Sequence, residues 1–182
     1  MTNNIESSSE SSSGIMALCE AIVKSENANV KQLLNEGVSP NGFVDFLESL
    51  QEYDLTPLHV AAAMGDVIIV EVLLDAEAEI DACRAEMITP LQVAAREGKL
   101  KVVELLIERG ANVNHVNIYN RNALHVVCYE NTDIVQLLVD NGVDFTLRDD
   151  KGYTPLELYI FRGGDPNNRA LTLLLSPPDA QK

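Results

Sequence analysis

The sequence has no tryptophan, and aromatic residues make up only 5% of its 182 residues. Apolar residues still make up 46% of the chain, so its core must be built from Ala, Leu, Val and Ile. This composition favours thin helical layers over one large globular core. From this length we expect one compact domain or one repeat array, without a second catalytic domain.

Cysteine and basic residues are also scarce. Cys19, Cys83 and Cys128 lie dozens of residues apart, with no CxxC or Cys/His cluster, which indicates reduced thiols rather than a disulfide framework or a zinc site. Thirteen Lys and Arg face 28 Asp and Glu, giving a net charge of −15. That charge argues against nucleic-acid binding, which depends on neutralising phosphates, and favours a protein partner with a basic surface.

Long apolar runs are absent as well. No stretch approaches the roughly 18 continuous apolar residues of a membrane span, and the first 13 residues lack the basic and apolar regions of a signal peptide. We therefore expect no membrane association and a cytoplasmic or nuclear location. Residues 1–14 are rich in Ser and Glu, which predicts a disordered tail. This tail would increase solubility or, through Ser7, be phosphorylated.

One short motif recurs along the chain. TPLHVAA at residues 56–62 returns as TPLQVAA at 89–95, NALHVVC at 122–128 and TPLEL at 154–158, at intervals of 33, 33 and 32 residues. Each of the first three copies is followed by a second apolar segment, at 70–74, 103–107 and 135–139. A Thr before a Pro is a good start for a helix, because the Thr caps it and the Pro fits its first turn. The pattern therefore predicts repeated pairs of helices.

With these motifs, the chain resembles the ankyrin-repeat family, whose unit is a β-turn finger followed by two antiparallel helices. The resemblance covers about Ile15 to Leu175. It implies an all-α repeat solenoid, an ankyrin-repeat array of stacked helix-turn-helix units with β-turn fingers and no extended sheet. Each unit buries its apolar face only against its neighbours, so Leu73, Leu106 and Leu138 are expected between the layers.

The resemblance divides the chain into five units. They are a divergent first repeat at 15–53 with a finger insertion, repeats at 54–86, 87–119 and 120–151, and a capping repeat at 152–176, followed by a tail at 177–182. Within the insertion, Phe43, Phe46, Leu47 and Leu50 have helical spacing, which predicts a short amphipathic helix. This segment would either grip a partner or cover the end of the first unit.

Two irregular positions are expected to lower local stability. Glu77 stands where Gly110 and Gly142 end the later second helices, and a Gly there supplies a positive φ. In the fourth unit Asn122 and Ala123 replace the Thr-Pro pair.

The resemblance gives the motif histidines, His59 and His125, a structural role as hydrogen-bonding partners of the capping residue or the finger backbone. Nothing in the chain matches a phosphate-binding loop, a nucleophile elbow or an HExxH helix, and the carboxylates fit a solvated face. We therefore expect no enzymatic activity, no cofactor and no metal site.

The resemblance places partner contacts on the concave face, at the fingertips and the exposed ends of the first helices, and Tyr and Arg are enriched at such interfaces. The candidate partner-binding residues are Tyr53, Leu55, Met64, Ile88, Arg96, Tyr119, Arg121, Tyr129, Tyr153 and Phe161. The mapped surface also includes Glu86, Ile118 and Asp150. Alternatively, the finger tyrosines pack on the next finger.

The predicted function is a non-catalytic module, monomeric by itself, that binds or sequesters an intracellular protein through this face. Two alternatives are an inhibitor resembling the inhibitor-of-kappa-B class, which masks basic regions of Rel-type transcription factors, and a regulatory subunit of an enzyme complex.

Overall fold

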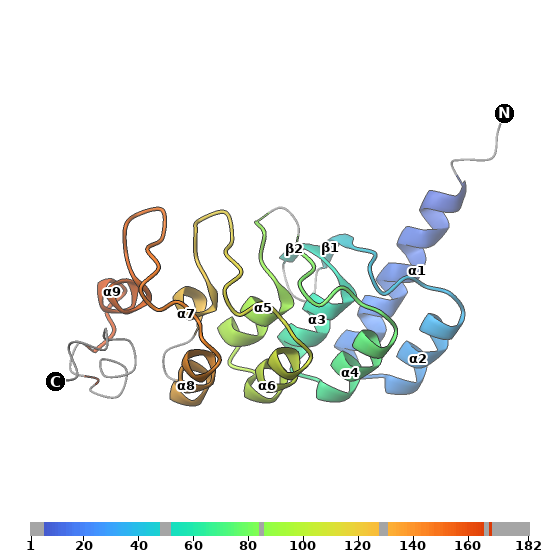
Figure 1. Ribbon diagram of the computed structural model, residues 1–182. Helices are drawn as coiled ribbons and strands as arrows, with labels where there is room; N and C mark the ends of the chain where they lie inside the picture. Colours follow the sequence, from blue (N-terminus) through green and yellow to red (C-terminus); the bar gives the residue numbers. More distant parts are fainter. Residues whose placement is uncertain (1–5, 48–51, 84–85, 128–130, 166–167, 169–182) are drawn as a thin grey trace.

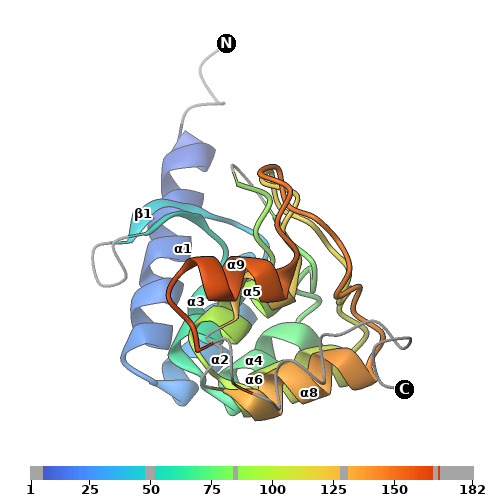
Figure 2. The ribbon, with the colours of Figure 1, turned by 90° about the vertical axis from the view of Figure 1, so that its left-hand side faces the viewer.

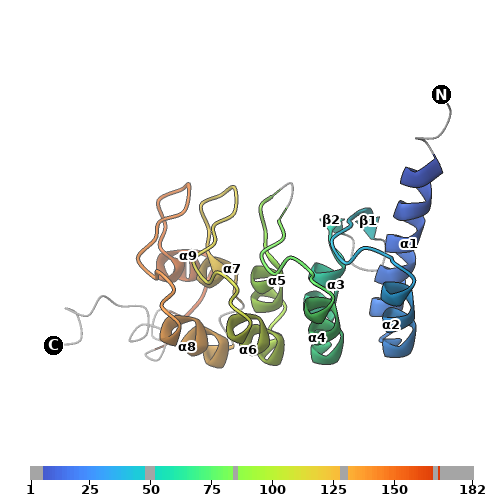
Figure 3. The same cartoon turned by 45° about the vertical axis from the view of Figure 1, so that its right-hand side comes forward.

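The computed structural model describes residues 6–47, 52–83, 86–127, 131–165 and 168. Its helices come in stacked pairs: α1 (Glu6–Val23) and α2 (Asn27–Asn35), α3 (Pro57–Met64) and α4 (Val67–Asp75), α5 (Pro90–Arg96) and α6 (Leu100–Glu108), α7 (Ala123–Val126) and α8 (Thr132–Asp140), then α9 (Pro155–Phe161). Figures 1 and 3 show the pairs side by side along one axis. The predicted helical repeat solenoid is confirmed. The end of the capping repeat lies outside the described residues.

The recurring motif starts each later first helix as its chemistry predicts. The side-chain oxygens of three capping threonines accept a hydrogen bond from the backbone N–H three residues on, and a Pro follows each of them, at Thr56, Thr89 and Thr154. Asn122 precedes α7, which has only four residues, whereas α3 has eight and α5 seven. The fourth unit thus has the shortest first helix of the described part.

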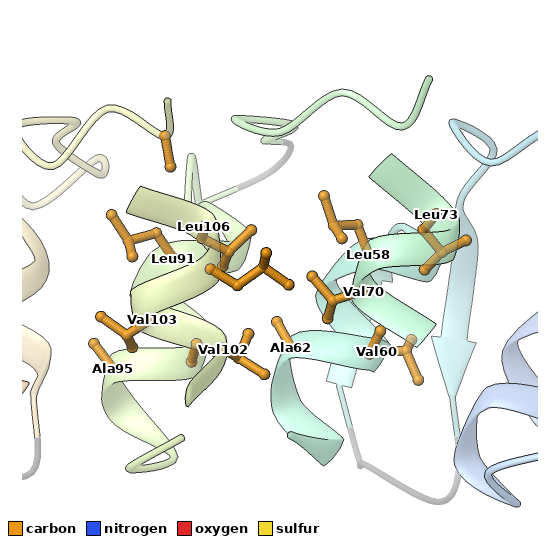
Figure 4. Packing of buried hydrophobic residues seen from close by; sticks show 14 of the residues in the cluster. Leu58, Val60, Ala62, Val70, Leu73, Leu91, Ala95, Val102, Val103 and Leu106 are labelled. Atoms are coloured by element: carbon orange, nitrogen blue, oxygen red, sulfur yellow. The ribbon is translucent and has the colours of Figure 1, made fainter. Parts of the chain in front are cut away.

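The core is a thin layer that runs the length of the array. Figures 1 and 3 show the first helices (α1, α3, α5, α7, α9) in one row and the second helices (α2, α4, α6, α8) in another. Leu73, Leu106 and Leu138 have no exposed surface, as predicted for residues between layers. In Figure 4 the side chains of α3 and α4 face those of α5 and α6, with the small Ala62 between the two layers. Small residues allow neighbouring backbones to approach.

The loops after the second helices are tied to one another by a ladder of side chains. Asn114 donates from Nδ2 to the carbonyl of Gly142 (3.0 Å), and its Oδ1 accepts from the N–H of Asp144 (2.7 Å). Asn41 makes the same two contacts with the second unit. Asp81, at the same place in the second unit, accepts from a backbone N–H of the third. These bonds join the first four units to one another through the loops that follow the second helices.

The insertion in the first unit is a β-hairpin, so the predicted amphipathic helix is wrong. Strand β1 (Val44–Leu47) pairs antiparallel with β2 (Glu52–Leu55), with Val44 opposite Leu55. Both of these side chains are buried, which holds the hairpin against the array. Val44 and Phe46 also alternate as a strand requires, and pairing with β2 decided between the two periodicities. The hairpin extends away from the row of fingers (Figure 2).

The disordered tail predicted at residues 1–14 is wrong for residues 6–14, because α1 begins at Glu6. The apolar part of α1, from Ile15 onward, packs on the array, and extending an existing helix costs far less than nucleating one. Residues 1–5 lie outside the described part. In Figures 1 and 3 the start of α1 projects beyond the helical layers.

Candidate partner-binding surface

The fingers before α7 and α9 each turn around one polar side chain. In the finger before α7, Oδ1 of Asn117 accepts hydrogen bonds from the backbone N–H groups of Tyr119 (3.0 Å) and Arg121 (3.1 Å). In the finger before α9, Oδ1 of Asp149 accepts from the same two positions. Asp and Asn favour such turns because their side chains bond to the backbone two residues ahead. The tips are thus held in a fixed conformation by their own sequence.

A side chain from each of α3, α5 and α7 holds the finger that follows. Nε2 of His59 donates to the carbonyl of Ile88 (2.9 Å), and Nε2 of His125 donates to the carbonyl of Tyr153 (3.2 Å). Gln92 takes the place of the His in the third unit and donates to the carbonyl of Arg121 (3.0 Å). The structural role predicted for the two histidines is confirmed. No group of three metal-ligating side chains occurs within the described residues.

Arg121 is engaged within the array. Its Nη2 lies 2.7 Å from Oδ2 of Asp149, whose side chain is fully buried, while only 16% of the Arg121 side chain is exposed. Burial of Asp149 opposes ionisation, but the bonds from Arg121 and two backbone N–H groups outweigh it and lower the pKa of this carboxyl. The guanidinium also lies over the ring of Tyr119, 5.6 Å from its centre. Arg121 therefore ties two fingers together and offers a partner little free surface.

The other candidates differ in how much surface they present. Leu55 is buried in the hairpin, and Ile88 is half-buried. Met64 is exposed at the end of α3, whereas Arg96 at the end of α5 is half-buried and pairs with Glu97 (3.0 Å). Tyr129 and the side chain of Tyr53 lie outside the described residues.

Two aromatic candidates form one cluster near the C-terminal end. The rings of Tyr153 and Phe161 stack with their centres 5.0 Å apart, and Phe161 is 67% exposed. Tyr153 thus stacks on α9 of its own unit rather than on a neighbouring finger. Tyr119 is exposed at the preceding fingertip. These side chains expose aromatic surface on both a finger and a first helix.

Two exposed apolar residues of the fingers and first helices, Met87 and Ile160, were not predicted from the sequence. Ile160 lies on α9 beside the predicted Phe161. Met87 belongs to a finger. It lies at the tip of the finger before α5, directly before the chosen Ile88, and its side chain points to solvent. A signal was available in the sequence: Met87 stands two residues before the capping Thr, at the place of Asn120 and Gly152 in the next two fingers. An apolar residue at a turn position favoured by Gly or Asn is unusual.

Comparison with known families agrees with this architecture. The family model described as "Ankyrin repeats (3 copies)" matches residues 91–181, and the model described as "Ankyrin repeat" matches residues 53–85. The chain belongs to the ankyrin-repeat family. A search of curated proteins finds no match to it. Ankyrin repeats are generally protein–protein interaction modules and typically lack catalytic activity. In the described part of this ankyrin array, no helix is long and apolar enough to cross a membrane.

Proposed function

We propose that this ankyrin array is a non-catalytic module that binds or sequesters an intracellular protein through its concave face. The main observation behind the proposal is the position of the exposed large apolar side chains. Six of the seven exposed ones in the described residues belong to a finger or a first helix: Met64, Met87, Ile118, Tyr119, Ile160 and Phe161. Exposed apolar side chains gathered on one surface are typical of interaction sites.

The charge of the chain supports a partner with a basic surface. A net charge of −15 attracts cationic proteins and repels acidic ones. Since Arg121 and Arg96 are already paired with carboxylates, they do little to weaken this attraction. The field acts chiefly on the rate of encounter, whereas the exposed aromatic and aliphatic side chains supply contact area after docking. We propose that the array is a monomer before it binds, in the cytoplasm or the nucleus.

Affinity purification followed by mass spectrometry tests the proposal directly. The bait is the full chain, compared with a concave-face variant that combines Met64→Ser, Tyr119→Ala and Phe161→Ser. Ile68→Ser serves as the matched control, because Ile68 is an equally apolar exposed residue on a second helix. We expect basic proteins that the wild type and the Ile68 variant retain and that the concave-face variant loses. Equal recovery by all three baits would contradict the proposal.

The identity of the retained protein separates the narrower alternatives. A Rel-type transcription factor would indicate an inhibitor resembling the inhibitor-of-kappa-B class. An enzyme whose turnover changes when the purified array is added would indicate a regulatory subunit. Turnover by the purified array alone would overturn the non-catalytic part of the proposal.

A further inference from the structure

Three consecutive fingertips are joined through their backbones. The N–H of Ile118 donates to the carbonyl of Glu86 (3.1 Å), and the N–H of Asp150 donates to the carbonyl of Tyr119 (3.0 Å). The tips therefore form one continuous strip of backbone through residues 86–87, 118–119 and 150, which we call the fingertip ribbon. It runs along the row of loops in Figure 1. Met87, Ile118 and Tyr119 lie on this ribbon with 44%, 51% and 38% of their surfaces exposed.

Met87 has an unfavourable backbone conformation. Its φ is 53°, in the left-handed region, where Asn120 (φ 54°) and Gly152 (φ 83°) occupy the same place in the next two fingers. Asn and Gly adopt this region readily, whereas in Met the β-carbon comes too close to the following carbonyl oxygen, which is unfavourable. The carbonyl of Met87 accepts a hydrogen bond from Nε2 of His115 (3.0 Å), which holds the strained turn in place. Strain kept at an exposed apolar side chain points to a role in binding.

Tyr119 is fixed in place before any partner arrives. Arg121 lies over its ring, and Asp149 in turn holds Arg121 through hydrogen bonds of 3.0 Å and 2.7 Å. An aromatic side chain with restricted freedom loses little entropy on binding, which favours affinity. The ribbon thus presents one rigid aromatic ring beside two aliphatic side chains.

Carboxylates stand beside these apolar side chains. Glu86 and Asp150, whose backbones make the two bonds that join the fingertips, both have exposed side chains. Lys151 is an exposed cation in the last finger, next to Asp150. The charge of Arg121 is neutralised within the array by Asp149. A ligand for this ribbon should therefore be apolar at its centre and cationic beside it.

We propose that Met87, Ile118 and Tyr119 form a fingertip anchor that binds a linear segment of a partner protein, in which an apolar side chain is flanked by Lys or Arg. This inference rests on the proposed function and specifies the segment that the concave face recognises. The apolar side chain contacts the anchor, and the flanking cations approach Glu86 and Asp150.

A display library of random linear peptides, selected on the full chain, tests the anchor. We expect enriched peptides to carry an apolar residue next to Lys or Arg. A synthetic peptide from that set should bind Met87→Gly and Ile118→Ser at least about fivefold more weakly, the change that follows from losing roughly 1 kcal/mol. Met87→Gly should also raise the urea midpoint, because it relieves the positive φ. Weaker binding by a more stable variant cannot come from unfolding.

Two controls match these variants. Ile68 is 54% exposed against 51% for Ile118, so Ile68→Ser removes a comparable side chain away from the fingers. Asn120→Gly changes the same turn position as Met87→Gly without removing an apolar group. Both controls should bind the peptide within about twofold of the wild type, well inside the loss expected for an anchor residue.

Three outcomes would overturn the anchor. The first is peptide binding that Met87→Gly and Ile118→Ser leave unchanged. The second is a set of enriched peptides without basic residues, and the third is no enrichment at all. If Met64→Ser or Phe161→Ser abolishes binding while the fingertip variants do not, the anchor is wrong but the concave face remains the binding surface. If every one of these variants binds the peptide like the wild type, the proposed concave face fails as well.

Discussion

Glu77 lies two residues after the end of α4 and has a φ of 64°. Gly37, Gly110 and Gly142 occupy the same place after the second helices of other units. A β-carbon in this region costs about 1–2 kcal/mol. Replacing it with Gly removes this strain, but the greater conformational freedom of Gly in the unfolded chain offsets part of the gain. We therefore expect Glu77→Gly to raise the free energy of unfolding by about 1 kcal/mol in urea. Glu77→Gln is the control, since it removes the charge and keeps the strain. Equal stabilisation by both variants would assign the effect to charge.

His125 makes stability depend on pH near neutrality. Burial lowers its pKa, outweighing the opposing effects of the Tyr153 carbonyl and the Asp149 carboxylate. The unfolded chain, with a His pKa of about 6.5, then binds the proton more tightly than the folded chain. The contribution of neutral His125 to stability is therefore fully present above about pH 6.5 and is lost progressively as the pH falls below it. The lowered pKa of Asp149 has its effect at more acidic pH, because its contribution is present above the unfolded value of about 3.9.

The variant His125→Gln isolates this effect, because Gln92 already fills the same role in the third unit. Urea midpoints measured between pH 8 and pH 5.5 should decline for the wild type and decline less steeply for the variant. A wild-type midpoint that does not change over this range would show that His125 titrates alike in both states.

At the scale of a helix, the second helices hold the layers together. Leu106 of α6 is fully buried between neighbouring units, and truncating such a Leu removes apolar contacts and leaves a cavity. We expect Leu106→Ala to lower the free energy of unfolding by roughly 2 to 5 kcal/mol, measured by circular dichroism in urea. Lys101→Ala, on the exposed side of the same helix, should change it by less than about 0.5 kcal/mol. Identical midpoints for Leu106→Ala and wild type would contradict the helix register.

The elements differ in how far the sequence predicts them. Helices α3 to α9 follow from the capping residues and the interval of the motif, because the same local chemistry recurs in each unit. The hairpin β1–β2 could not be derived, since Phe43, Phe46 and Leu47 fit a helix while Val44 and Phe46 also fit a strand. Only its pairing with β2 and the burial of Val44 resolve this ambiguity. The start of α1 was hidden by a composition typical of disorder.

Prediction of the binding surface was also limited by contacts that only the folded structure shows. The sequence identifies fingertip positions, but burial and pairing decide which side chains remain available there. Arg121 fits the residue types of an interface, yet the buried Asp149 engages it. Met87 was missed because Tyr and Arg are the residue types that interfaces favour, whereas its signal is the turn position that it shares with Asn120 and Gly152.

For the whole molecule, net charge and exposed apolar surface should affect binding in separable ways. With a basic partner identified by affinity purification, Tyr119→Ala should weaken the complex by more than about 1 kcal/mol, because an exposed aromatic anchor is lost. Its urea midpoint should stay close to that of the wild type. Lys101→Ala should leave affinity unchanged, since Lys101 lies on the exposed side of α6, away from the fingers.

Salt separates the contribution of charge from that of contact. A net charge of −15 steers a cationic partner over distances comparable to the screening length, about 10 Å at 0.1 M salt. Raising salt should therefore slow association more than it speeds dissociation, in stopped-flow or surface-binding kinetics. Tyr119→Ala should show the opposite pattern, with faster dissociation and the wild-type dependence of association on salt, because it removes contact and leaves the charge unchanged. If the association rate does not depend on salt and Tyr119→Ala binds normally, the binding site lies away from the fingers. The hairpin of the first unit would then be the segment to delete and measure next.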